Sequence, residues 1–357
     1  VSVKGALMAD AHSGYGLPIG GEHATHNAVI PYGVGKDIGC RMCMSIYNLP
    51  MQFLEKKTAQ LKDILIENTR FGREEFNDIR DNKILERNEF KEISFLKELK
   101  DKAYSQLGTS GGGNHFVDVG IVYIHAHHEV FMGIPAGVYL SVLSHSGSRG
   151  MGAEIARYYT NIAKKKRDLG KGTANLAWLE LDEEEGIEYW LAMNLAGDYA
   201  SANHQIIHQK IATALNEKPM KMIENHHNFA WKEKIADGTE LIVHRKGATP
   251  ASRGAMGIIP GSMATPAYVV IGKGNEESLN SASHGAGRLM SRAQAKSSFS
   301  GKQLQNILSK KGIHLIGGSL DESPMAYKNI DKVMAVQKDL VEVAGVFHPR
   351  IVRMSGK

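Results

Sequence analysis

Asp37 and Cys40 stand three residues apart in the segment VGKDIGCRM, on either side of a turn that Gly39 permits. A carboxylate and a thiolate in one turn can both bind metal, whereas a turn aspartate beside a buried cysteine is the purely structural alternative. The chain has only one other cysteine, Cys43, so a site of four cysteines is excluded. The C-x-x-C pair is typical of half a zinc site or of a redox centre. If this stretch forms a strand, the two thiols lie on opposite faces and do not bind one ion together.

Several histidines stand beside glycine, asparagine or serine rather than within apolar runs. They are His115 in GGGNHFVDV, His145 in LSHSGSRG, His226 and His227 in ENHHNFAWKE, and His284 in SASHGAGR. A lone histidine is usually a surface residue or a hydrogen-bonded core residue. Repeated in similar loop contexts, and together with Asp37 and Cys40, these histidines predict a polynuclear metal site. One thiolate, one carboxylate and three imidazoles can hold two metals if the thiolate bridges them, and ligand softness alone favours zinc.

Glycine-rich segments suggest anion binding. GTSGGGNH, HSGSRG, PGSMAT and HGAGR expose backbone N–H groups beside polar side chains, although ordinary turns use the same residues. Basic residues near these segments, whose guanidinium groups suit phosphates, are Arg149, Arg245, Lys246, Arg253, Arg288 and Arg292. The chain has no Walker motif, and no G-x-G-x-x-G follows a predicted strand, so any nucleotide binds outside those geometries.

At this point the motifs carry a resemblance to a known family. DAHSGYGLPIG, VGKDIGCRM, GTSGGGNHF, HSGSRG, HHN, RKGA, IPGSM, SHGAGRLMSR and PMAYKNIDKVM occur in this order from near the start of the chain to near its end. In this order they resemble the RtcB family of RNA ligases, the 3′-phosphate/5′-hydroxyl ligases of tRNA splicing and RNA repair.

The resemblance implies a GTP-dependent enzyme with two Mn²⁺ ions per chain. Such an enzyme opens a 2′,3′-cyclic phosphate to a 3′-phosphate and joins that RNA end to a 5′-hydroxyl end. It implies that Cys40 bridges the metals, that Asp37 and His115 complete one site, and that His145 and His227 complete the other. It therefore favours manganese over the zinc that ligand softness favours.

The remaining roles also follow from the resemblance. His284 matches the histidine that becomes guanylylated, and Asp10 matches an aspartate that we expect to orient it. An unprotonated imidazole can attack phosphorus without a separate base. Arg149, Arg288 and Arg292 match arginines that we expect to hold RNA phosphates. The matched GTP-binding residues are Asn114, Phe116, Asp118, Asn228, Pro260, Gly261, Ser262, Met263, Ala267, Gly285, Ala286 and Gly287, and we add Lys357 to them.

Departures from the family pattern concern the nucleotide pocket. Asp118 stands where the family usually has glutamate, and Ala267 stands where it usually has serine. The family's near-terminal lysine, which contacts guanine, aligns with Ser355 here, and Lys357 follows two residues later. We expect Lys357 to fold back into the pocket, because Gly356 tolerates unusual turns; the alternative is a frayed terminus. These differences bear on nucleotide affinity more than on metal binding.

Composition limits the class of protein that must position these residues. Hydrophobic residues make up 42% of the chain and charged residues 23%, as in soluble globular proteins. No apolar run approaches the roughly 20 residues of a membrane span, and two cysteines predict a reducing, cytoplasmic compartment. The net charge of +5 permits a polyanionic partner. Because polar motifs are spread along the whole chain, we expect one large α+β domain over residues 1–357, with mixed β-sheets flanked by helices.

The pattern of apolar residues predicts the elements. Residues 1–48 predict strands and loops, and residues 50–106 predict a charged insertion of amphipathic helices. The segment from 137 to 168 predicts strand, loop and helix, and residues 184–215 predict a long helix. We expect one or two helices over residues 322–347 and a closing strand over residues 348–357.

Other functions remain compatible with the same motifs. A paralogue could guanylylate or repair RNA ends without splicing tRNA. A protein that binds RNA ends would not need a complete set of metal ligands and a nucleophile. A dinuclear metal phosphoesterase would not need His284 and would form no covalent GMP adduct. The expected partners are RNA ends, GTP and an archease-type activator, with no membrane.

Overall fold

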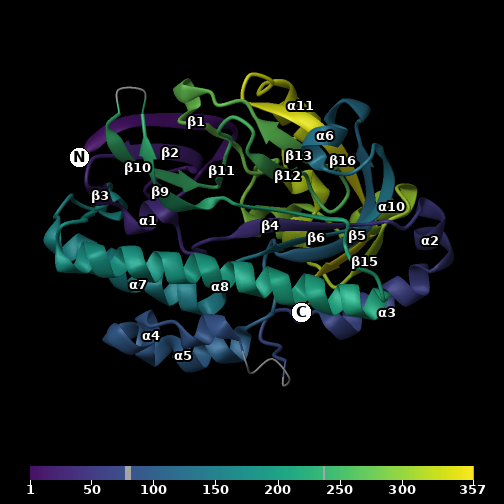
Figure 1. Cartoon of the computed structure of the whole chain (residues 1–357), viewed down its shortest axis with the longest axis horizontal. Coiled ribbons are helices and arrows are strands. Elements are labelled where there is room, and N and C mark those ends of the chain that lie inside the picture. The colour runs from purple at the N-terminus through teal and green to yellow at the C-terminus, as the bar shows by residue number, and fades with distance from the viewer. Residues whose placement is uncertain (77–81, 236–237, 357) are drawn as a thin grey trace.

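A mixed sheet of eight strands forms the centre of the molecule, and the long helices lie along one side of it (Figure 1). The computed structural model describes residues 1–76, 82–235 and 238–356. Within these ranges, no helix combines the length and the apolar composition that crossing a membrane requires. The strands of the path are, in spatial order, β12 (Met256–Pro260), β13 (Ala267–Gly272), β16 (Val341–Met354), β5 (Phe116–Ile124), β6 (Gly137–Ser146), β4 (Arg41–Tyr47) and β8 (Lys221–His226), and β15 (His314–Ile316) pairs in parallel with β16.

The central sheet is buried on both faces, and alternate side chains on its strands enter two different cores. On β5, Val117 and Val119 pack with side chains from α3 (Thr58–Asn68) and α8 (Glu184–Leu215). Val122 and Ile124 of the same strand belong to the core on the opposite face. This explains why β4 and β5 read as almost continuously apolar.

The two ends of the sheet path approach each other. The Oδ1 atom of Asn225 on β8 accepts a hydrogen bond of 2.9 Å from the backbone N–H of Ile258 on β12. The sheet is therefore rolled toward a barrel, and side chains from strands far apart in the sequence share one interior.

A second, four-stranded antiparallel sheet contains the N-terminal strands (Figure 1). Its order is β1 (Ser2–His12), β2 (Ile19–Thr25), β10 (Glu240–Lys246) and β9 (Asn228–Lys234). Two short ladders pair β11 (Ala248–Pro250) with β14 (Ser281–Ser283) and β3 (Ala28–Val29) with β7 (Leu179–Glu180). The strands and loops predicted for residues 1–48 are confirmed, with one helical turn, α1 (Pro31–Val34), among them.

Helix α8 is the 32-residue helix predicted over residues 184–215. It begins with Glu184 and Glu185, whose charges suit a helix N-terminus, and ends before Asn216, which adopts φ 53°. The predicted strand, loop and helix are β6 followed by α7 (Arg149–Lys166), which packs beside α8. In Figure 1, α8 runs beneath the central sheet, and α4 (Glu89–Glu92) and α5 (Ser94–Gln106) lie beyond it.

The charged segment over residues 50–106 forms α2 (Met51–Lys56), α3, α4 and α5, as its amphipathic pattern predicted. Leu61 and Leu65 of α3 are buried against the sheet, and Leu96 and Leu99 of α5 are buried against α7 and α8. Its apolar stripes therefore contribute to the main cores, while its charges remain outside.

The prediction for residues 322–347 was wrong in most of its length. Among its described residues the structure has one short α-helix, α11 (Ile330–Ala335), and a 3₁₀ turn at Pro324–Ala326, and β16 begins at Val341. The segment VEVAGVF is rich in residues that favour strands, and it pairs with β13 and β5 on its two sides. The predicted closing strand is the end of β16. The remaining helices are α6 (Glu129–Met132), α9 (Arg292–Ser298) and α10 (Gly301–Lys310).

The buried carboxyl group of Glu22, on β2, makes the stability of the fold depend on pH. Its carboxylate is 2% exposed, and neither oxygen has a hydrogen-bond partner among the described residues. Burial raises the pKa of this carboxyl to about 9, although Arg245 opposes the shift. The unfolded chain releases this proton near pH 4.5 and the folded chain keeps it, so stability is lost as pH rises from about 4.5 to about 9.

We therefore expect Glu22→Gln to flatten the pH dependence of unfolding in this window. The contribution of one proton is at most about 1.4 kcal/mol per pH unit. Urea unfolding at pH 6 and pH 8 measures it, with the wild-type chain as reference. Equal slopes for the two proteins would show that Glu22 is ionised in the folded state.

Candidate metal centre and adjoining pocket

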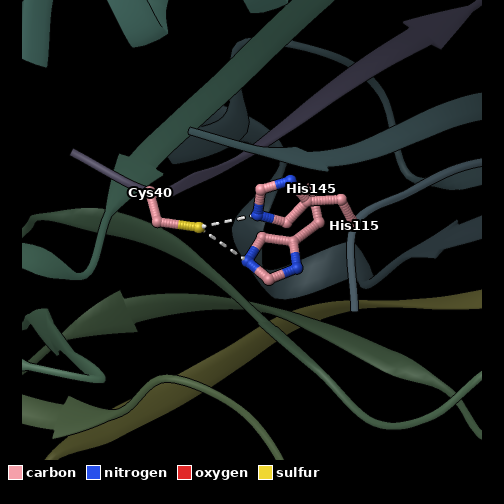
Figure 2. A group of neighbouring side chains, drawn as sticks. All are labelled: Cys40, His115 and His145. Atoms are coloured by element: carbon pink, nitrogen blue, oxygen red, sulfur yellow. Dashed lines mark hydrogen bonds between the residues drawn. The ribbon is translucent and has the colours of Figure 1, made fainter. Parts of the chain in front are cut away.

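Cys40 lies immediately before β4 and points toward two histidines from neighbouring segments. Its Sγ is 3.1 Å from Nε2 of His145 and 3.5 Å from Nε2 of His115. Figure 2 shows both imidazole rings turned toward the sulfur, one from the end of β6 and one from the loop before β5. Gly39 adopts φ 67°, and a Cβ there would lie 2.8 Å from the Cα of Gly197 on α8. Only glycine therefore allows α8 to approach the turn that carries Cys40.

Contacts continue outward from this centre in two directions. On one side, Nε2 of His115 lies 2.8 Å from Oδ2 of Asp37. On the other side, Nε2 of His145 lies 3.2 Å from Nε2 of His227. Cys40 thus stands in the middle, between an imidazole–carboxylate pair and an imidazole–imidazole pair. The structure brings together all five residues that the resemblance implied as metal ligands.

Backbone carbonyls fix which ring nitrogens face the cluster. Nδ1 of His115 lies 2.6 Å from the carbonyl oxygen of Ser110, and Nδ1 of His145 lies 3.0 Å from that of Asn114. A carbonyl oxygen can only accept, so both Nδ1 atoms carry hydrogen and both Nε2 atoms face the cluster. Nδ1 of His227 is buried and has no hydrogen-bond partner within the described ranges.

The buried cluster has the ionisation states of a ligand set. Burial lowers the pKa of His145 to about 3 and that of His227 well below its ordinary value, so both imidazoles are neutral. Burial acts to raise the pKa of Asp37, but its contacts with His115 and Cys40 outweigh this effect and leave a carboxylate. Burial and Asp37 raise the pKa of the Cys40 thiol, which a bound metal would deprotonate. These residues therefore fit a centre of two metal ions.

A cavity of about 300 Å³ adjoins the cluster, with His145, His227 and His284 on its wall. The remaining wall includes most of the residues predicted to bind GTP: Asn114, Phe116, Asp118, Pro260, Gly261, Ser262, Met263, Ala267, Gly285, Ala286 and Gly287. Residues that sequence reasoning missed include His12, Thr265 and Tyr327. His12 follows Asp10 in the ADAH motif and Thr265 follows PGSM, so proximity to recognised motifs was the available signal.

His284 lies against a buried carboxylate. Its Nδ1 is 2.6 Å from Oδ2 of Asp10, which is fully buried and also accepts a 3.3 Å hydrogen bond from the N–H of Gly285. The rings of His284 and His227 are 5.1 Å apart between centroids. Gly287 adopts φ 74°, and a Cβ there would lie 2.1 Å from the carbonyl oxygen of Asp10. The glycine loop therefore packs directly on the strand that carries the aspartate.

Two residues predicted to bind the nucleotide are not found on this wall. Asn228 is not among the residues that line the cavity; its Nδ2 donates to the carbonyl oxygen of Asp37 at 3.2 Å, and its Oδ1 accepts from the N–H of Gly247 at 2.8 Å. Lys357 lies outside the described residues. Ser355, at the place aligned with the family's lysine, lines a separate hollow with Arg73 and Arg353.

The three predicted RNA-binding arginines lie in two different settings. Arg288 and Arg292 are on the cavity wall and pair with Asp321 and Glu322; Nη1 of Arg292 lies 2.9 Å from Oδ2 of Asp321. Arg149 begins α7, and its guanidinium donates to Oγ1 of Thr109 at 2.9 Å and to the carbonyl oxygen of Gly72 at 2.8 Å. Sequence reasoning missed the two acids, which stand together in the segment SLDESP.

In chemical terms, the cavity places the imidazole of His284, glycine N–H groups and two arginines beside the five-residue cluster. Such a wall suits phosphate groups, whose negative charge N–H groups, guanidinium groups and metal ions can each neutralise. The carboxylate of Asp10, 2.6 Å from Nδ1 of His284, favours hydrogen on that nitrogen through its negative charge, which would leave the lone pair on the other ring nitrogen.

The amino-acid sequence is similar to those of one known protein family. The family model described as tRNA-splicing ligase RtcB matches residues 1–95 and 74–355. The RNA-splicing ligase RtcB of Escherichia coli (strain K12) is 34% identical, covering 95% of this chain and 86% of that protein. The tRNA-splicing ligases RtcB of Archaeoglobus fulgidus and Thermococcus kodakarensis are 32% and 31% identical, covering 97% and 92% of this chain and 85% and 83% of theirs. The chain therefore belongs to the RtcB family.

Proposed function

We propose that this protein is a GTP-dependent RNA ligase, which joins a 2′,3′-cyclic phosphate or 3′-phosphate RNA end to a 5′-hydroxyl end through a guanylylated histidine. The observation that carries the proposal is the 2.6 Å contact between His284 and the buried Asp10, on the same cavity wall as His145 and His227. The names of the relatives, RNA-splicing and tRNA-splicing ligase, support the reaction class.

His284 is the proposed nucleophile. With hydrogen held on Nδ1 by Asp10, Nε2 attacks the α-phosphorus of GTP, a P–N bond forms, and the bond to pyrophosphate breaks. An oxygen of the RNA 3′-phosphate then attacks the same phosphorus, and the P–N bond breaks to release His284. Finally the 5′-hydroxyl oxygen, losing its proton, attacks the RNA phosphorus and GMP leaves.

The ligand set assigned to the metals is Asp37, Cys40, His115, His145 and His227. Two Mn²⁺ ions bound there would align the triphosphate and neutralise its charge. Manganese rather than zinc rests on the family resemblance, since the thiol and imidazoles alone suit zinc. An archease-type activator rests on the same resemblance, and a cytoplasmic location rests on the presence of only two cysteines in the chain.

The guanine end of the cavity is assigned to Asp118. Its side chain is 5% exposed, and its Oδ1 has no hydrogen-bond partner among the described residues. Burial raises the pKa of this carboxyl well above its ordinary value. A purine that donates two hydrogen bonds would stabilise the carboxylate and use the orphaned oxygen.

The test of the function uses α-labelled GTP with Mn²⁺, followed by denaturing electrophoresis, and a joining assay with a cyclic-phosphate RNA and a 5′-hydroxyl RNA. We expect a covalent adduct that acid removes and alkali spares, as for a phosphoramidate, and joined RNA that depends on GTP. Joining without GTP would overturn the mechanism. Loss of terminal phosphate without label or joining would indicate a phosphoesterase instead.

RNA binding is assigned to Arg149, Arg288 and Arg292. Replacing all three with alanine should leave labelling by GTP in place and weaken RNA joining, because backbone phosphates lose their cations. For three contacts to single-stranded RNA, the slope of log affinity against log salt should become shallower by about 2. Filter binding at several salt concentrations measures the slope.

The matched control for this variant is Arg157→Ala. Arg157 is on α7 with Arg149 but makes an exposed ion pair with Glu154. The control should keep both the salt slope and the rate of joining. If the triple variant joined RNA as well as this control, the RNA would follow another surface.

A further inference from the structure

The second cysteine faces a group of its own, on the opposite side of β4 from Cys40. Cys43 is fully buried, and its cross-strand neighbour on β6 is Ser144. Opposite them, α8 carries His204 and His208, which are one helical turn apart and buried (0% and 2% exposed). The sulfur of Cys43 and one nitrogen from each ring all lie within 4.8 Å of one another. The sulfur of Cys40 and one nitrogen each from His115 and His145 also lie within 4.8 Å of one another.

Hydrogen bonds direct both rings of this second group inward. Nε2 of His204 lies 3.2 Å from the carbonyl oxygen of Ser146 and so carries hydrogen, which leaves the lone pair on Nδ1. That Nδ1 lies 2.6 Å from Oγ of Ser144, and Nε2 of His208 lies 2.8 Å from the same atom. Nδ1 of His208 contacts Oγ of Ser45 at 2.6 Å. Each histidine therefore has one outer nitrogen held by Ser146 or Ser45 and one inner nitrogen at Oγ of Ser144, and the sulfur of Cys43 lies within 4.8 Å of a nitrogen of each ring.

One thiol and two imidazoles are ligands that zinc prefers. Two histidines at positions i and i+4 of a helix present their nitrogens to one ion, and a thiolate with imidazoles selects zinc. A hydroxyl or a water can complete the tetrahedron. The nearest charged side chains, Arg41 and Glu224, pair with each other, so neither a free cation nor a free acid among the described residues competes for the site.

We propose that Cys43, His204 and His208 form a second, buried metal site that binds one zinc-type ion, separate from the cluster around Cys40. On binding, the thiol of Cys43 releases one proton to solvent and its sulfur bonds the ion. His204 binds through Nδ1 and His208 through Nε2, whose hydrogen moves to Nδ1 beside Ser45. The ion would pin α8 to β4 and β6, the strands that position Cys40 and His145.

Burial supports this exchange of a proton for an ion. It raises the pKa of the Cys43 thiol far above neutrality and lowers the pKa of His208 to about 4, so the metal-free site is electrically neutral. A neutral site of two imidazoles and one thiol is stable in the core without metal, and binding a divalent ion leaves a single net positive charge there.

The Cys40→Ser variant isolates the proposed site, because Cys43 is then the only thiol in the chain. Co²⁺ serves as the probe: a near-ultraviolet band from sulfur to cobalt can come only from Cys43. We expect this band, together with the visible bands of tetrahedral cobalt, to saturate at one equivalent and to disappear when Zn²⁺ is added. The double variant Cys40→Ser/Cys43→Ser should show no sulfur band.

A second comparison applies if Cys40→Ser does not fold. Zinc content and thermal midpoint are measured in the wild-type chain, in Cys43→Ser and in His208→Gln, with His244→Gln as a control that removes a buried histidine outside both groups. We expect one equivalent of zinc fewer, and a loss of zinc-dependent stabilisation, in the first two variants and not in the control. A folded Cys40→Ser chain without the sulfur band, or equal zinc content in all variants, would overturn the proposal. Neither result depends on the catalytic role of His284.

Discussion

Covalent labelling by α-labelled GTP is expected to disappear in His284→Ala, with a fall of at least about 10³-fold, because this substitution removes the atom that would carry GMP. The fold should persist, since the imidazole is on a cavity wall and its neighbours Gly285 and Gly287 keep their backbone. Labelling followed by denaturing electrophoresis measures the effect, and a thermal melt checks the fold.

A substitution at Asp10 tests how the neighbouring carboxylate affects labelling of His284. Asp10→Asn keeps the shape of the carboxylate but removes the charge that holds hydrogen on Nδ1, so labelling should slow by roughly 10²- to 10⁴-fold. His23→Ala is the matched control, because His23 is on β2 and does not line this cavity. Label that persists on His284→Ala would assign GMP to another residue, and a lost signal in the His23 variant would point to general damage.

The second large effect concerns the metals. Cys40→Ser should lose Mn²⁺ from both positions, with binding weakened by at least about 100-fold, because the thiolate that the family resemblance implies both ions share becomes a neutral hydroxyl. Cys43→Ser is the matched control: the same substitution, three residues along, on the opposite face of β4. It should retain two Mn²⁺ ions. Electron paramagnetic resonance of free Mn²⁺ during a titration gives both the affinity and the number of ions bound.

The contrast between the two variants matters more than either value alone. If Cys40→Ser kept both ions at wild-type affinity, the thiol would not be a bridging ligand and the five-residue set would need revision. If Cys43→Ser also lost Mn²⁺, the two faces of β4 would not be independent, and the proposed zinc-type site would be coupled to the catalytic one.

Local pattern predicted the elements where one signal dominated. The helix over residues 184–215 and the amphipathic stripes of α3 and α5 follow from apolar spacing alone. The prediction for the C-terminal segment failed because the helical pattern around Ile330–Ala335 was extended too far, although the valines and Phe347 of VEVAGVF favour a strand. The pairing of that strand with β13 and β5 depends on distant segments and could not be predicted from it alone.

The site divides in a similar way. The residues of recognised motifs, such as Cys40 and His284, could be named from sequence because short loops carry them. The pairing of Arg292 with Asp321 could not be predicted, because it depends on how the start of α9 packs against the 3₁₀ turn at Leu320–Glu322. The pair His204 and His208 had a visible signal, an H-x-x-x-H spacing, but nothing in the sequence shows that Cys43 faces it.

Asn228 joins two parts of the site that have separate jobs. Its amide links the carbonyl of Asp37, in the turn of the metal ligands, to the N–H of Gly247, where a Cβ would lie 3.1 Å from a ring carbon of His284. These two hydrogen bonds link the turns, so we expect the separation between His284 and the turn of Asp37 to vary little. Replacing Asn228 should then appear mainly as a less favourable entropy of activation, because the two groups would no longer be held in one orientation before reaction.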